Sequence, residues 1–317
     1  MLTEDPKMSH TRRTFIGSSA AVALSAAPAM PTRLFGQTGK RISIVAFGCG
    51  SRFLSYKEED EAIAVIHKAL DLGITYFDTA YDYGAGLSET RVGKALGTRR
   101  KDVYLATKIP SRNGDAAMRI IEGSLKRCQT DHFNTIHIHS LTTEADLAAI
   151  EAKDGILNVL YKLREQKVAH NVGISCHTDP KVLRTALERH DFNVTQFALN
   201  AARIGQARND GDPAKDSFEA LALPVALRKK MGVTAMKIFA QEKLNGKTSV
   251  ENLVRYSLSL PVGAVVLGMP KIEHLEQNTS IAKAFSPMSR NEMTGLNGQL
   301  SEYKAAIDTF FHDHVDA

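Results

Sequence analysis

The nine residues YFDTAYDYG, at positions 76–84, change abruptly from an apolar run to polar side chains. The aromatic residues at 76–77 are typical of a buried strand, and the segment after Asp78 is typical of a loop. The following positions, 88–96, carry apolar residues at helical spacing, with Ser88 as the predicted cap and a glycine after the last residue. This stretch therefore predicts a strand, a polar loop and a helix in succession.

The same succession repeats along the chain. From Arg41 onward, eight short β-branched or aromatic runs alternate with amphipathic helical patterns. The predicted strands are 42–48, 76–78, 103–108, 135–139, 171–175, 194–200, 233–237 and 264–267. The predicted helices are 59–72, 88–96, 116–128, 157–166, 180–190, one ending near 231, 250–258 and 273–285, followed by a last helix, 290–311, without a strand of its own.

Eight such units match a (β/α)8 (TIM) barrel, for which a length of about 250 residues is typical. A doubly wound open sheet is the alternative, but it normally needs a glycine-rich phosphate turn after its first strand. The nearest approach, FGCGS at 47–51, lacks the third glycine of that turn. No change in composition suggests a second domain. We therefore expect a single α/β domain at 41–317, a (β/α)8 barrel with an extra C-terminal helix.

The composition is that of an ordinary globular protein. Of 317 residues, 43% are hydrophobic and 24% charged, with a net charge of +5, which excludes disordered, collagen-like and multi-span membrane classes. No run approaches the roughly 18 apolar residues of a membrane span. The basic residues form no face suited to nucleic acid. Cys49, Cys128 and Cys176 are far apart, so we expect neither a disulfide framework nor a metal site.

Residues 1–29 have the order of parts found in an export signal. The paired arginines at 12–13 precede a weakly apolar run, 16–27, and the residues APA at 27–29 offer a small-residue cleavage site. This order resembles a twin-arginine signal, which implies the twin-arginine machinery as a partner and a periplasmic location. A basic tail beside an Ala-rich helix is the alternative. We expect residues 30–40 to be a flexible leader.

Four polar residues lie at or just after the ends of three consecutive predicted strands. Asp78, Lys108 and His139 end these strands, and Tyr83 follows five residues after Asp78. Because the carboxyl ends of barrel strands face one pocket, we expect these side chains to converge. A phenol has a pKa of about 10, and a neighbouring ammonium lowers that pKa by stabilising the phenolate, so the set suits protonation of a carbonyl oxygen. Taken alone, an Asp78–Lys108 ion pair is more often structural than catalytic.

The stretch 73–84, with SE at 88–89 and GKAL at 93–96, resembles the signature of the aldo-keto reductases. The resemblance extends over nearly all of the chain after residue 40. It implies a (β/α)8 barrel that uses NADPH to reduce an aldehyde or ketone. The implied catalytic residues are Tyr83 as proton donor, Asp78 and Lys108 as the groups that tune it, and His139 as the group that orients the carbonyl.

The resemblance also implies a cofactor site, which this sequence matches less completely. Ser175 and Gln196 occupy the positions that bind the nicotinamide carboxamide, and Cys176 stands where the family usually has Asn. Met236 replaces an aromatic residue that stacks on the nicotinamide, and Lys237 points towards the pyrophosphate. The remaining implied cofactor residues are Gly48, the adenine-side Gln277 and Asn278, and Lys271, which substitutes for the usual partners of the 2′-phosphate of NADP(H).

Two other functions stay open at this point. A barrel of this family could hold the cofactor tightly with slow turnover, as a sensor or partner subunit. A barrel aldolase or isomerase would instead use Lys108 to form a Schiff base. The substrate is not readable, because it depends on the loops 48–57 and 201–217 and on the C-terminal segment. We expect a monomer without an iron–sulfur cluster, since no cysteine follows Cys176.

Overall fold

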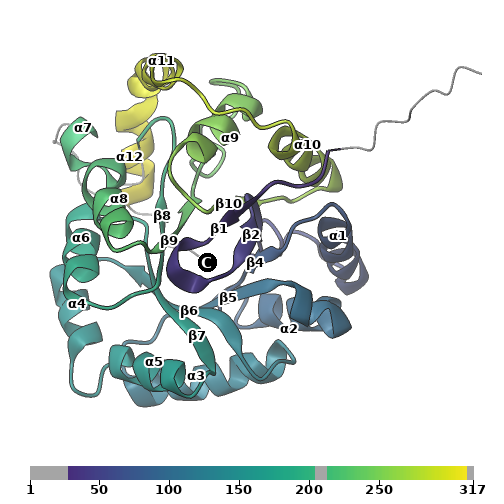
Figure 1. Cartoon of the computed structure of the whole chain (residues 1–317), viewed down its shortest axis with the longest axis vertical. Coiled ribbons are helices and arrows are strands. Elements are labelled where there is room, and N and C mark those ends of the chain that lie inside the picture. The colour runs from purple at the N-terminus through teal and green to yellow at the C-terminus, as the bar shows by residue number, and fades with distance from the viewer. Residues whose placement is uncertain (1–27, 204–212, 313–317) are drawn as a thin grey trace, which may run out of the picture.

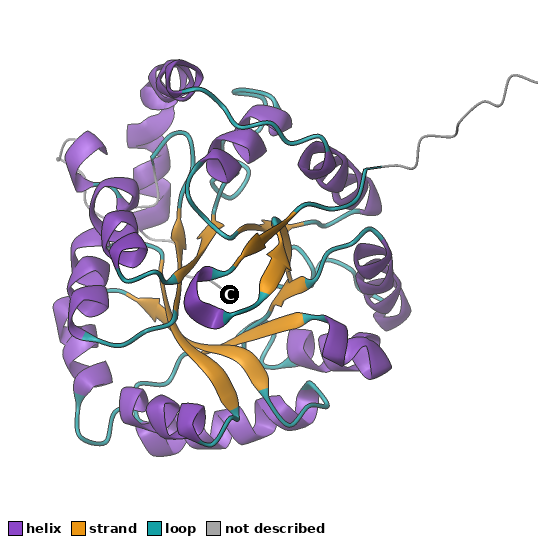
Figure 2. Ribbon diagram, viewed as in Figure 1, coloured by secondary structure: helices purple, strands orange, loops and turns teal. Residues whose placement is uncertain are grey.

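The computed structural model describes residues 28–203 and 213–312, which form one closed barrel (Figure 1). Eight parallel strands hydrogen-bond in the order β10-β3-β4-β5-β6-β7-β8-β9, so the last strand pairs with the first strand of the barrel. Helices surround these strands as an outer ring (Figure 2). The predicted (β/α)8 barrel is confirmed. Its strands are β3 Val45–Gly48, β4 Tyr76–Asp78, β5 Tyr104–Ile109, β6 Phe133–Leu141, β7 Ala169–Cys176, β8 Val194–Ala198, β9 Gly232–Met236 and β10 Ala264–Gly268.

The helices turn an apolar face towards the strands. In α1 (Glu59–Asp71), for example, the buried residues Ala62, Val65, Ile66 and Ala69 recur at the spacing of one helix face. The other helices are α2 Leu87–Leu96, α3 Gly114–Arg127, α4 Glu144–Glu151, α5 Ile156–Glu165, α6 Pro180–Arg189, α7 Pro213–Asp216, α8 Phe218–Arg228, α9 Val250–Ser259, α10 Ile272–Lys283, α11 Arg290–Leu300 and α12 Lys304–His312.

The helices differ from the prediction in two places. The last predicted helix is divided into α11 and α12 by the short 3-10 helix Ser301–Tyr303. Helix α4 was not predicted, although the hydroxyl of Thr143 caps it by accepting a hydrogen bond from the backbone N–H of Asp146. Only Leu147 and Ile150 of α4 are buried, so its apolar periodicity is too brief to stand out in the sequence.

The segment 30–40, which we expected to be a flexible leader, is an ordered part of the fold. Strand β1 (Thr32–Leu34) pairs antiparallel with β2 (Arg41–Ser43), and the 3-10 helix Gly36–Thr38 lies between them. This hairpin crosses the centre of the ring of strands (Figure 1). The predicted strand 42–48 is accordingly divided, because its first part belongs to the hairpin and its second part to the barrel.

Phe35 explains why the leader prediction is wrong. Its ring is fully buried and meets the rings of Tyr76 and Tyr104 edge-on, with centroids 5.7 and 5.3 Å apart. Gly232 and Gly263 leave space for this ring, since a Cβ added at Gly263 would lie 2.5 Å from it. The hairpin therefore closes the amino-terminal end of the barrel with packed aromatic side chains.

Within the described residues, no helix is long and apolar enough to cross a membrane. The export signal predicted for residues 1–29 lies almost entirely outside the described part of the chain, as does the centre of the loop 201–217. The fold therefore leaves the targeting prediction untested.

Candidate active site

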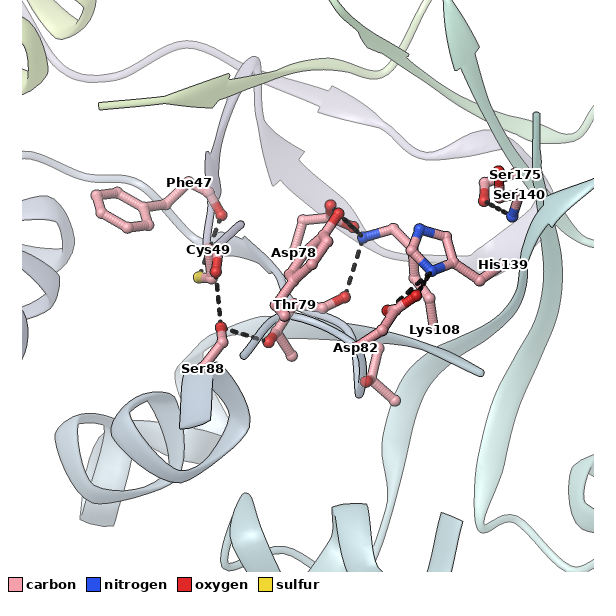
Figure 3. Close-up of polar contacts among 12 residues, drawn as sticks. Phe47, Cys49, Asp78, Thr79, Asp82, Ser88, Lys108, His139, Ser140 and Ser175 are labelled. Carbon is pink, nitrogen blue, oxygen red and sulfur yellow. Dashed lines mark hydrogen bonds and ion pairs between the residues drawn. The ribbon is translucent and has the colours of Figure 1, made fainter. Parts of the chain in front are cut away.

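The register of three adjacent strands brings the predicted catalytic residues together at the carboxyl end of the barrel. Asp78 is the last residue of β4, Lys108 lies one residue before the end of β5, and His139 lies near the end of β6. Parallel pairing aligns β4 with β5 and β5 with β6. Figure 3 shows the side chains of Asp78, Lys108 and His139 converging on one small region.

Lys108 is the centre of this group. Its Nζ donates hydrogen bonds to Oδ2 of Asp78 at 2.6 Å, to the carbonyl of Thr79 at 2.9 Å and to the hydroxyl of Tyr83 at 3.3 Å. The side chain is only 1% exposed, and its charge is compensated by the Asp78 carboxylate. Burial alone would lower the pKa of Lys108, but Asp78 and Tyr83 raise it above its ordinary value. The ammonium therefore stays charged beside the phenol.

The loop after β4 holds Tyr83 in place. The backbone N–H of Tyr81 donates to the carbonyl of Lys108 at 3.1 Å, which ties this loop to β5. Ser88 adds a second tie, because its hydroxyl donates to the carbonyl of Cys49 and lies 2.7 Å from the hydroxyl of Thr79 (Figure 3). Helix α2 begins before Ser88, so the prediction that Ser88 caps the helix is wrong; its hydroxyl is used inside the structure instead.

His139 has a partner that the sequence did not reveal. Its Nδ1 lies 2.9 and 3.0 Å from the two carboxylate oxygens of Asp82, and its ring meets the ring of Tyr83 edge-on at 5.8 Å. Burial raises the pKa of Asp82, but the hydrogen bond and charge of His139, with a smaller effect of Lys108, bring it below its ordinary value. Asp82 belongs to the same short motif as Tyr83, yet its partner is 57 residues away in sequence, so spacing alone could not find the pair.

Two further residues at this end of the barrel were missed. His177, just after β7, lines the cavity, and its ring centroid lies 6.0 Å from that of His139. Arg112 donates to the backbone carbonyls of His139 and Ser140 at 2.7 and 3.0 Å, and it forms a two-point ion pair with Asp146. Arg112 therefore fixes the end of β6, where the chain leaves its regular register.

A cavity of about 270 Å³ opens beside this group. Asp78 and Tyr83 are part of its wall, while Lys108 and His139 are buried behind them. The predicted cofactor residues that line the cavity are Gly48, Gln196, Met236, Lys237, Gln277 and Asn278. These residues come from the barrel strands, the segment after β9 and α10, and their binding of a cofactor stays a prediction.

Three predicted cofactor residues do not line this cavity. The hydroxyl of Ser175 accepts a hydrogen bond from the backbone N–H of Ser140, and Lys271 is exposed at the start of α10. The thiol of Cys176 is fully buried and directed at the carbonyl of Asp179, and burial raises its pKa to about 12. Cofactor contact by these three residues stays a prediction.

Two buried amides in the cavity wall carry atoms without partners. Gln196 is 1% exposed, and neither Oε1 nor Nε2 has a hydrogen-bond partner among the described residues. Asn278 is 3% exposed, and its Oδ1 also has no hydrogen-bond partner among the described residues. Because a buried polar atom without a partner costs free energy, these positions favour a ligand that supplies both donors and acceptors.

An ion pair connects two loops at this cavity. Arg52 follows β3, Glu242 follows β9, and Nε of Arg52 lies 3.1 Å from Oε1 of Glu242. Both side chains are more than a third exposed, so the pair adds little to the stability of the fold. It joins two otherwise separate parts of the cavity wall.

The fold and this site together define a class of barrel oxidoreductase. Residues 45–210 match the model of the Aldo/keto reductase family, which is just over half of the chain. The chain belongs to this family, and its activity is that of an oxidoreductase enzyme.

The chain is also similar to individual oxidoreductases. The chain is 26% identical to the uncharacterized oxidoreductase YqkF of Bacillus subtilis (strain 168), over 87% of this chain and 99% of that protein. It is 25% identical to the L-galactose dehydrogenase of Arabidopsis thaliana, over 87% and 94% of the two chains. The structure of an aldo-keto reductase from Klebsiella pneumoniae in complex with NADPH matches with a TM-score of 0.69 and 22% identity, over 86% and 96%. The last comparison bears on the fold.

Proposed function

We propose that this protein reduces an aldehyde or ketone to an alcohol with NADP(H), and that Tyr83 supplies the proton. The observation that carries this proposal is the position of the Lys108 ammonium. It binds the Asp78 carboxylate at 2.6 Å and the Tyr83 hydroxyl at 3.3 Å, at the edge of a cavity large enough to admit a ligand. A structural ion pair alone would have no need of the phenol.

The proposed role of each residue follows from its charge and contacts. As the Tyr83 hydroxyl gives its proton to the carbonyl oxygen, negative charge develops on the phenol, and the Lys108 ammonium stabilises that charge. Asp78 keeps Lys108 protonated and holds it in place. The phenolate then recovers a proton from solvent, and the product is the alcohol.

The buried amides of the cavity fit a dinucleotide. The unpartnered Oε1 and Nε2 of Gln196 match the donor and acceptor of a nicotinamide carboxamide, and Oδ1 of Asn278 can accept a hydrogen bond from an adenine amino group. When bound, NADPH supplies the hydride that adds to the carbonyl carbon. The solved relative from Klebsiella pneumoniae holds NADPH, which supports the same choice for this chain.

The phosphates of the cofactor would meet basic side chains on the cavity wall. Arg52, Lys237 and His274 line it, whereas the predicted partner Lys271 does not. Guanidinium and ammonium groups bind phosphate through charge-assisted hydrogen bonds. These three residues therefore support binding of the cofactor's phosphates.

We further propose that the chain is exported by the twin-arginine route as a folded protein. The proposal rests on the order of parts in residues 1–29. Replacing both arginines at 12–13 by lysine should keep the protein inside the cytoplasm of a bacterium with this pathway. Equal amounts of the wild-type and variant chains in the periplasmic fraction would contradict the proposal.

The enzymatic proposal is tested by titrating the purified protein with NADPH and NADH and assaying a panel of carbonyl compounds. We expect tighter binding of NADPH and turnover of at least one aldehyde or ketone. Tight NADPH binding without turnover of any carbonyl would favour the sensor alternative. Trapping of a substrate on Lys108 by borohydride, without a nicotinamide requirement, would favour a Schiff-base enzyme.

A further inference from the structure

The contact between Asp82 and His139 determines which nitrogen of the imidazole carries hydrogen. Nδ1 of His139 lies 2.9 and 3.0 Å from the two carboxylate oxygens of Asp82 (Figure 3). The other nitrogen, Nε2, is buried and has no hydrogen-bond partner among the described residues. The two nitrogens are therefore in different environments: a carboxylate holds Nδ1, whereas Nε2 is buried without a partner in the described part of the chain.

A carboxylate only accepts hydrogen bonds, so the nitrogen that faces Asp82 must be the donor. With hydrogen on Nδ1, the neutral ring presents a bare lone pair at Nε2. Nε2 then accepts a hydrogen bond in the neutral ring and donates one only in the imidazolium. This consequence follows from the geometry of the pair alone.

The carbonyl compound and the alcohol of the proposed reaction need opposite hydrogen-bond partners. A carbonyl oxygen accepts a hydrogen bond, whereas an alcohol hydroxyl can donate one. Resting on the proposed function, we propose that Asp82 is a positioning residue that fixes His139 in the Nδ1–H form, so that His139 holds a carbonyl when protonated and an alcohol when neutral. Carbonyl reduction and alcohol oxidation would then need different protonation states of one imidazole.

Several titratable groups face His139, and only one of them touches its ring nitrogen. Tyr83 and Asp82 come from the loop after β4, Lys108 from β5, His137 from β6 itself and His177 from the end of β7. The positive charge of Lys108 opposes an imidazolium, but Asp78 pairs with it at 2.6 Å. Asp82 is thus the group whose carboxylate directly contacts a ring nitrogen of His139.

A purely structural reading is that Asp82 ties the Tyr83 loop to β6. Asn at position 82 separates the two readings, because its side chain has nearly the same shape and keeps a hydrogen bond to the ring. Its amide can donate to Nδ1, which allows the neutral ring to carry hydrogen on Nε2. Glu at position 82 keeps the carboxylate and serves as the conservative rescue.

The first experiment reads the tautomer directly, by 15N NMR of the full-length protein, with the His139 signals assigned by their loss in His139→Gln. At alkaline pH we expect a pyridine-like Nε2 resonance in the wild type and a shift towards a pyrrole-like resonance in Asp82→Asn. A pyrrole-like Nε2 in the neutral wild-type ring would overturn the inference, whatever the enzyme reduces.

The second experiment measures the pH profile of kcat/KM for carbonyl reduction. In the wild type, we expect the rate to fall on the alkaline side, because a neutral His139 with hydrogen on Nδ1 cannot donate to the carbonyl oxygen. In Asp82→Asn this alkaline fall should be smaller, because the neutral ring can carry hydrogen on Nε2 and still donate it. Asp82→Glu should keep the wild-type profile.

A matched control comes from the opposite end of the barrel. Asp131 lies 2.6 Å from Nδ1 of His132, so Asp131→Asn changes the same kind of pair far from the cavity and should leave the profile unchanged. An alkaline fall in Asp82→Asn as large as that of the wild type would overturn the inference. Absence of carbonyl turnover in the wild type at every pH would instead overturn the proposed function, and the NMR result would still decide the tautomer.

Discussion

The two ends of the barrel are built from the same strands but closed in different ways. At the amino-terminal end, the rings of Phe35, Tyr76 and Tyr104 fill the interior and are shielded by the β1–β2 hairpin. At the carboxyl end, charged and amide side chains surround a cavity, and Gln196 has polar atoms with no partner in the described chain. The difference indicates that one end stabilises the fold and the other gives up some stability to receive a ligand.

The largest expected effect separates chemistry from binding at the carboxyl end. Tyr83→Phe should lower kcat for carbonyl reduction by about 10²–10⁴-fold, because the proton donor is lost while the ring remains. The dissociation constant for NADPH should change little. Tyr81→Phe is the matched control in the same loop and should retain activity in steady-state assays. Unchanged turnover in Tyr83→Phe would remove this phenol from the mechanism.

The second prediction concerns the amino-terminal end. Phe35→Ala should lower the free energy of unfolding by about 3–5 kcal/mol, because it leaves a cavity among packed aromatic rings. The kcat of the molecules that remain folded should be close to that of the wild type. Leu34→Ala, on the same hairpin but 59% exposed, should cost no more than about 0.5 kcal/mol by denaturant unfolding. Similar losses in the two variants would contradict the closure of the barrel by Phe35.

The third prediction compares binding with stability at one position. Gln196→Leu removes two buried polar atoms that have no partner in the described residues, so the free energy of unfolding should stay the same or rise. NADPH binding should weaken about tenfold, which corresponds to about 1.4 kcal/mol. Titration with NADPH measures the binding, and denaturant unfolding of the same preparation measures the free energy of unfolding. A clear loss of stability would mean that this amide serves the fold.

The smallest expected effect is a response of the carboxyl end to acid. Burial raises the pKa of Asp146, but its hydrogen bonds and charge pairing with Arg112 lower it below its ordinary value. The stabilisation is therefore present above the ordinary pKa of about 3.8 and is lost as pH falls through the lower, folded-state value. Hydrogen exchange at the end of β6 should increase over this range in the wild type and change less in Asp146→Asn. An equal increase of hydrogen exchange at both ends of the barrel would contradict this prediction.

Much of the fold could be predicted from local patterns. Strand and helix periodicity, repeated eight times, is enough to indicate the barrel, and the ends of strands give the positions of Asp78, Lys108 and His139. Their convergence with Tyr83 needs only the parallel register of neighbouring strands. The chemical roles of these residues stay predictions.

The parts that could not be predicted depend on contacts between distant segments. The hairpin at residues 32–43 carries little apolar periodicity, and Phe35 is informative only once its position inside the barrel is known. The pairing of Asp82 with His139 joins the loop after β4 to strand β6, and nothing in either segment alone indicates the other. Ser175 and Cys176 are a similar case, since their side chains form hydrogen bonds with backbone groups of Ser140 and Asp179 that the sequence does not indicate.

The position of Phe35 also has a consequence for synthesis of the chain. Its ring fits against Gly232, the first residue of β9, and Gly263, the residue directly before β10. A residue near the beginning of the polypeptide must therefore wait for nearly the whole chain to leave the ribosome before it reaches its final place. A nascent chain stalled before residue 232 would lack both glycines that make room for this ring, so the amino-terminal end of the barrel would stay incompletely packed.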